Sequence, residues 1–123
     1  MSQLARIFAV AAIVSTGLAG EALAHAHLKS ATPAENATVT ASPNEIDLTF
    51  SEGINLKFSG ATVSSSDKTA VSIGLAKLAA GDDMTLVVPV TKPLSAGKYT
   101  VDWHALSTDG HKSKGSYSFT VKP

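Results

Sequence analysis

Four residues of the chain are of types that bind metal ions, and their positions would let them bind the same ion. His25 and His27 follow a run of small and apolar residues near its start, and Asp109 and His111 lie close to its other end. If a peptidase cuts before His25, that residue offers one metal both its free α-amine and its imidazole. Asp109 and His111 would then complete a set of nitrogen and oxygen donors, which suits Cu(II).

The available donors favour Cu(II) over Cu(I). Imidazole, amine and carboxylate groups suit Cu(II), whereas Cu(I) prefers thiolate and thioether ligands. The chain has no cysteine and two methionines, Met1 and Met84, and Met1 is part of the leader described below. Zn(II) could use the same donors, but Cu(II) binds more tightly in the divalent series.

Each candidate ligand also has an ordinary interpretation. His25 and His27 could be solvated terminal residues, and His27 could bind Cu(II) through backbone amides beside a free amine without any fold. Asp109 and His111 are spaced i, i+2, so an extended segment would place both on one face, with Gly110 keeping the approach open. A simple turn would instead leave His111 solvated, and the sequence leaves these alternatives open.

Two further residues, His104 and Glu52, are of types that bind metal ions, but the sequence gives less reason to assign them to a metal site. His104 follows Trp103 and lies on the opposite face of a predicted strand, so an exposed sheet residue is the simpler interpretation. Glu52 is a single acid at the end of another predicted strand, and taken alone it indicates no particular chemistry.

Residues 1–24 have the build of a secretory signal peptide. Arg6 supplies a positive start, residues 7–18 are mostly apolar, and Ala22-Leu23-Ala24 is a small-x-small cleavage signal. The apolar run is shorter than the roughly 20 residues of a transmembrane helix, although an uncleaved anchor is the alternative. A second cut after Ala26 would leave His27 first. We expect export, with residues 25–123 as one mature domain.

The composition of residues 25–123 excludes several classes of function. Without Arg6 and Glu21 the chain has no arginine, and its lysines balance its acids. No basic patch is present to bind nucleic acid, and no basic amphipathic helix to bind a membrane surface. The absence of cysteine removes thiolate metal sites and cysteine nucleophiles. We expect a soluble monomer.

The elements that would position these residues are β-strands. Polar and apolar residues alternate over residues 45–50, 98–106 and 115–121, which predicts strands with one buried and one wet face. Shorter extended segments are predicted at residues 61–63, 71–73 and 85–88, with a turn at residues 66–68. Only residues 75–80 are helix-friendly, and that run is too short to be stable alone.

Residues 94–99 predict the type of sandwich. Tyr99 enters a strand just after a turn with Leu94 and Gly97, which is the pattern of a tyrosine corner. That feature belongs to Greek-key β-sandwiches of the Ig type, and turn signals roughly every ten residues support the same architecture. Trp103 on the following strand is the natural core residue.

Taken in order, the motifs of the mature chain resemble the CopC family of periplasmic copper-resistance proteins. They are His25-Ala26-His27-Leu28, Ser30-Ala31-Thr32-Pro33-Ala34, Leu48-Thr49-Phe50-Ser51-Glu52, Leu94-x-x-Gly97-x-Tyr99-x-Val101-x-Trp103, Ser107-Thr108-Asp109-Gly110-His111 and Gly115-Ser116-Tyr117-Ser118-Phe119-Thr120-Val121. The resemblance covers essentially the whole mature chain, and the ordered set is far more specific than any single motif.

The resemblance implies an all-β, Greek-key β-sandwich of about seven strands, Ig-like and related in shape to cupredoxins. It also implies a Cu(II) site built from the amine and side chain of His25 with Asp109 and His111. His27 matches a histidine near the start of some members. Glu52 matches an acid that has been assigned to the copper site in some members.

One departure from the family pattern predicts which metal is bound. Many members with two sites have a methionine-rich loop for Cu(I), whereas residues 63–84 contain only Met84. The chain therefore resembles the members that bind Cu(II) alone. The resemblance implies a periplasmic protein, not an enzyme, that sequesters the copper ion and passes it to an inner-membrane CopD-type transporter. The alternatives are a histidine-brace copper monooxygenase and a metal-free Ig-like interaction domain.

Overall fold

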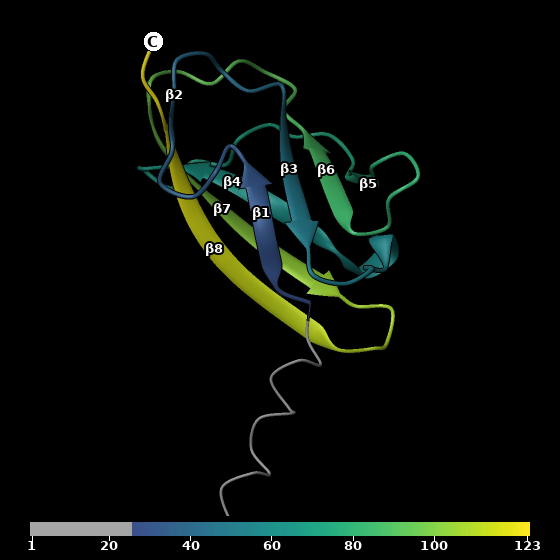
Figure 1. The fold of residues 1–123 in the computed structure, drawn as a ribbon. Coiled ribbons are helices and arrows are strands. Elements are labelled where there is room, and N and C mark those ends of the chain that lie inside the picture. The colour runs from purple at the N-terminus through teal and green to yellow at the C-terminus, as the bar shows by residue number, and fades with distance from the viewer. Residues whose placement is uncertain (1–25) are drawn as a thin grey trace, which may run out of the picture.

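The computed structural model describes residues 26–123, and the predicted leader and His25 lie outside this range. The described residues form two four-stranded sheets packed face to face, with one 3₁₀ turn, η4 (Figure 1). In chain order the elements are β1 (Leu28–Thr32), β2 (Thr38–Val39), β3 (Glu45–Phe50), η4 (Leu56–Phe58), β4 (Gly60–Ser65), β5 (Lys77–Leu78), β6 (Thr85–Pro89), β7 (Gly97–Leu106) and β8 (Lys112–Val121).

The order of the strands makes this an Ig-like sandwich. One sheet has the order β1-β3-β6-β5 and the other the order β2-β8-β7-β4. Strand β2 runs parallel to the end of β8, whereas the other pairs are antiparallel. If β1 and β2 are the two halves of one first strand, these orders match the ABED and CFG sheets of the Ig fold. The predicted all-β Greek-key sandwich is confirmed.

The core lies between the inward faces of the long strands. On β3, Ile46, Leu48 and Phe50 are buried and alternate with more exposed residues, as the sequence pattern predicts. Phe50 meets Trp103 of the opposite sheet edge to face, with ring centroids 5.2 Å apart. The prediction that Trp103 packs in the core is confirmed, because its side chain is only 9% exposed.

A tyrosine corner fixes the start of β7. The hydroxyl of Tyr99 donates a hydrogen bond of 2.8 Å to the carbonyl oxygen of Ser95. Its ring stacks on Phe119, with centroids 5.7 Å apart. Gly97 has a φ of 146°, which only glycine adopts readily, so the turn that delivers Tyr99 depends on this residue. The predicted tyrosine corner is confirmed.

The prediction of a strand over residues 71–73 is wrong. This segment crosses between the sheets, so its backbone bonds change partner within four residues. The amide of Val71 donates to Val63 on β4, whereas that of Gly74 donates to Pro89 on β6. Only isolated bridges remain, such as the one between Ile73 and Val90. Residues 75–80 contain the short strand β5 and no helix.

The short strands β1, β2 and β5 were not predicted from the sequence. None has enough residues for a clear alternation, and each exists because it adds to the edge of a longer strand. Within residues 26–123, no helix is long and apolar enough to cross a membrane.

One end of the sandwich gathers the segments that carry the predicted ligands. The described chain enters β1 at this end, which also holds the turn between β7 and β8 and the connection that follows β3 (Figure 1). The fold therefore brings the first and the last of the predicted ligand segments to the same end.

Candidate metal centre

Asp109 and His111 lie in the turn that joins β7 to β8. Residues 108–110 form the turn, and Gly110 within it has a φ of 95°, a backbone angle that favours glycine. The segment is not extended, yet the two side chains meet, because His111 Nδ1 is 3.1 Å from Asp109 Oδ1. Both side chains are 48% exposed. The turn thus pairs a carboxylate and an imidazole at an open surface.

Hydrogen bonds favour the ionised form of the Asp109 carboxyl group. The hydroxyl of Ser107 donates to its Oδ1, and the backbone amide of His111 approaches the same oxygen at 3.4 Å. These contacts favour the charged form, so the pKa of Asp109 is lowered, chiefly by Ser107 and next by the side chain of His111. An ionised carboxylate is the form that binds a metal ion.

Glu52 lies beside this turn, in the connection that follows β3. Thr108 donates a backbone hydrogen bond of 3.0 Å to Gly53, the neighbour of Glu52, and Ile54 forms a bridge with Ser107. Atom Oε2 of Glu52 is buried and has no hydrogen-bond partner among the described residues. A buried carboxylate oxygen in that state is costly unless a cation or a donor approaches it.

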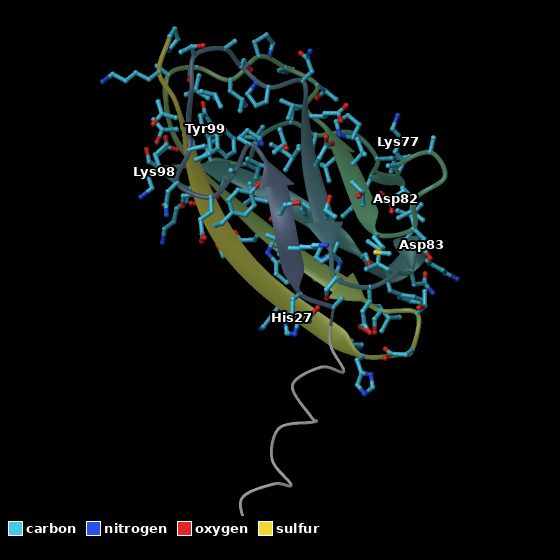
Figure 2. The ribbon with its side chains drawn as sticks, in the orientation of Figure 1. His27, Lys77, Asp82, Asp83, Lys98 and Tyr99 are labelled. Carbon is cyan, nitrogen blue, oxygen red and sulfur yellow. The ribbon has the colours of Figure 1, made fainter. Side chains whose placement is uncertain are left out.

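The first described residues are held at the same end of the sandwich. His27 exchanges hydrogen bonds with Ser51, because its amide donates to Ser51 Oγ at 2.9 Å and its carbonyl accepts from the Ser51 amide at 2.9 Å. The carbonyl oxygen of Ala26 accepts from Ser113 Oγ at 2.7 Å. Figure 2 shows His27 at the beginning of β1, alongside β8. The first described residues therefore lie between the end of β3 and the start of β8.

Comparison with known proteins assigns the chain to a family. Residues 28–122 match the model of the CopC domain, which is nearly all of the described chain. The protein belongs to the CopC family. It is 46% identical over 112 residues to Protein YobA of Escherichia coli strain K12, and the alignment covers 90% of each chain.

Solved structures of the CopC family share this fold. The crystal structure of CopC from Methylosinus trichosporium OB3b superimposes with a TM-score of 0.75 at 34% identity, covering 80% of this chain and 95% of the other. PcoC, described as a methionine-rich copper resistance protein from Escherichia coli, gives a TM-score of 0.72 at 38% identity, covering 80% of this chain and all of the other.

The structure brings some of the predicted CopC ligands together and leaves one out. Asp109 and His111 are in contact, and Glu52 and His27 lie in segments hydrogen-bonded around them, whereas His25 is outside the described residues. Residues 26–123 contain no group of three histidine, aspartate or glutamate side chains that could hold a metal ion. The metal centre predicted from the sequence includes His25, which the structure does not describe.

The remaining histidine lies on β7 and is not part of the turn that carries Asp109 and His111. His104 is exposed on the outer face of β7, opposite in register to Gly60 on β4 and Lys114 on β8. Its position agrees with its interpretation as an ordinary sheet residue.

Sequence reasoning missed two serines whose hydrogen bonds organise the candidate site. Ser107 contacts both Asp109 and His111, and Ser51 pairs with the backbone of His27. Both residues stand inside the family motifs, two positions before Asp109 and one position before Glu52. Position within a motif was the only signal, because a serine hydroxyl has no preferred partner until the fold supplies one.

Proposed function

We propose that this CopC-family protein binds Cu(II) in the periplasm, holds it there and delivers it to a partner. The observation that carries the proposal is the contact between Asp109 and His111 at the end of the sandwich where the described chain begins. Two ligands held at 3.1 Å give half of a nitrogen and oxygen site. The residue that would complete this site is His25, which directly precedes Ala26 in the sequence.

The geometry of the first residues supports His25 as that ligand. Ala26 is buried and bonded to Ser113, two residues after His111. Consecutive Cα atoms are about 3.8 Å apart, so the position of Ala26 supports the proposal that the amine of a chain cut before His25 would reach this turn. The amine and imidazole of His25 would then bind Cu(II) with Asp109 and His111.

Glu52 and His27 are the proposed supporting groups. The unpartnered Oε2 of Glu52 fits a cation close by, either bound directly or through water. His27 is exposed in the segment that carries His25, so its imidazole can complete the coordination. The donors fit Cu(II), which binds imidazole, amine and carboxylate groups well.

The same donors argue against a methionine-rich Cu(I) site. PcoC is described as methionine rich, whereas this chain has only Met84 outside the predicted leader. Met84 lies between β5 and β6. A single thioether does not make the soft ligand set that Cu(I) prefers. We therefore propose a carrier for Cu(II) and assign it no enzymatic activity.

The proposed location and partner follow from the leader and the family. Residues 1–24 read as a signal peptide, so the mature chain would act in the periplasm and start at His25. An inner-membrane CopD-type transporter is the proposed acceptor of the copper ion. The open position of the site, with Asp109 and His111 half exposed, suits transfer of the ion to another protein.

A competitive Cu(II) titration with electron paramagnetic resonance (EPR) tests the terminal ligand. The protein that starts at His25 is compared with the same protein extended by one alanine, which converts the amine into a peptide nitrogen. We expect at least a hundredfold weaker binding and a changed EPR spectrum on extension, because one chelating nitrogen is lost. His104→Ala is the matched control and should bind like the parent.

Equal affinity of the parent and extended proteins would show that the amine of His25 is not a ligand. Cu(II) should also raise the Tm of the parent, because a ligand bound only by the folded state stabilises it. A parent that neither binds Cu(II) nor gains stability from it would refute the proposed function altogether.

A further inference from the structure

Ser107 is a buried polar residue at the base of the turn that carries Asp109 and His111. Its side chain is 1% exposed, and its backbone forms a bridge with Ile54. The only other buried polar residue in the described chain is Ser59, which is 8% exposed. A buried hydroxyl needs hydrogen-bond partners, and those of Ser107 are the two proposed ligand residues.

The hydroxyl of Ser107 connects the two ligands. It donates to Oδ1 of Asp109 and accepts from the backbone amide of His111 at 3.2 Å. The carbonyl of His111 also lies 3.2 Å from this hydroxyl and accepts the backbone amide of Ser107 at 2.9 Å. Because a hydrogen bond to a carboxylate is stronger than one to a neutral carbonyl, the hydroxyl proton favours Asp109.

These bonds distinguish the two carboxylate oxygens of Asp109. Oδ1 of Asp109 already receives the Ser107 hydroxyl, the His111 amide and the contact with His111 Nδ1. Oδ2 is therefore the oxygen of Asp109 that remains to face a cation. Without the hydroxyl, the carboxylate of Asp109 could rotate in a half-exposed turn.

We infer that Ser107 is the positioning residue of the copper site, holding Asp109 and His111 in the arrangement that binds Cu(II). The inference rests on the proposed function, since it concerns the same site. Ser107 does not touch the metal. Residues that orient metal ligands typically change metal affinity by about 10- to 100-fold when they are replaced.

The test uses Ser107→Ala in the protein that starts at His25, with Ser59→Ala as the matched control. Ser59 is also a buried serine, and its hydroxyl accepts from the backbone amide of Leu106 at 3.0 Å without contacting either ligand. Both variants lose one hydroxyl at neighbouring positions. Competitive Cu(II) titration, the EPR spectrum and the Tm without copper are measured for each protein.

We expect Ser107→Ala to weaken Cu(II) binding about tenfold or more and to change the EPR spectrum, while Ser59→Ala keeps the affinity and spectrum of the parent. Parent-like affinity and spectrum in Ser107→Ala would overturn the inference and leave the proposed function intact. Equal losses in both variants, in step with Tm, would also overturn it, because they indicate a general effect on stability. No Cu(II) binding by the parent would overturn both.

Discussion

Replacing Gly115 by alanine tests the packing between β7 and β8, the two strands joined by the turn that carries Asp109 and His111. Gly115 on β8 lies opposite Trp103 on β7. A Cβ at this position would be 2.6 Å from Cζ2 and 2.8 Å from Cε2 of the indole, closer than real Cβ contacts allow. The indole is rigid and packed against Phe50, so either the ring or β8 must move.

The size of the effect follows from that overlap. Forcing an extra methyl group into a well-packed core costs about 1–3 kcal/mol. A loss of about 2 kcal/mol in a domain of this size lowers Tm by about 8–16 °C. Thermal unfolding measures the shift, and Trp103 reports the local change directly because it is the only tryptophan of the chain.

Gly74→Ala is the matched control. A Cβ at Gly74 would lie 3.4 Å from Cβ of Pro89, which is ordinary contact. This substitution should leave stability within about 1 kcal/mol of the parent or raise it slightly, through the lower entropy of the unfolded chain. An unchanged Tm and unchanged tryptophan emission in Gly115→Ala would refute the packing argument.

The other predictions concern three polar groups, each measured by urea unfolding. Tyr99→Phe should lower the free energy of unfolding by about 1 kcal/mol, because the hydroxyl loses its bond to Ser95. Tyr117→Phe should leave the free energy of unfolding unchanged or raise it, because that hydroxyl is buried without a hydrogen-bond partner among the described residues. A larger loss of stability in Tyr117→Phe than in Tyr99→Phe would contradict both predictions. Burial, with help from Glu45, raises the pKa of Asp47 from 3.8 to about 6. Between about pH 4 and pH 6 the folded state therefore binds more protons than the unfolded chain, so the free energy of unfolding should fall as the pH rises through this range. Asp47→Asn should make the free energy of unfolding depend less on pH in this range. An equal pH dependence in Asp47→Asn and the parent would show that Asp47 is not the group responsible.

The sequence alone determined the long strands and the type of sandwich. Alternation over β3, β7 and β8 is a local property of the chain, since successive side chains on a strand point to opposite faces. The tyrosine corner at Tyr99 is local too, because its partner Ser95 is only four residues away. The residue types also defined the donors available to a metal, because the chain has no cysteine and few methionines.

Only the tertiary structure decided how the other segments pair. Residues 71–73 look like a strand, yet their backbone bonds are divided between two sheets. The short strands β1, β2 and β5 depend on neighbours distant in the sequence, which no local pattern encodes.

The arrangement of the candidate site also depended on long-range contacts. Asp109 and His111 could be named from the sequence, and their contact is local to the turn, but only the structure shows that they meet and that the hydroxyl of Ser107 is bonded to both residues. The bond between Ala26 and Ser113 joins residues 87 positions apart and brings the start of the described chain to that turn. Residue types are a property of the sequence, whereas the approach of the first described residues to this turn arises from contacts that form only when the two sheets pack.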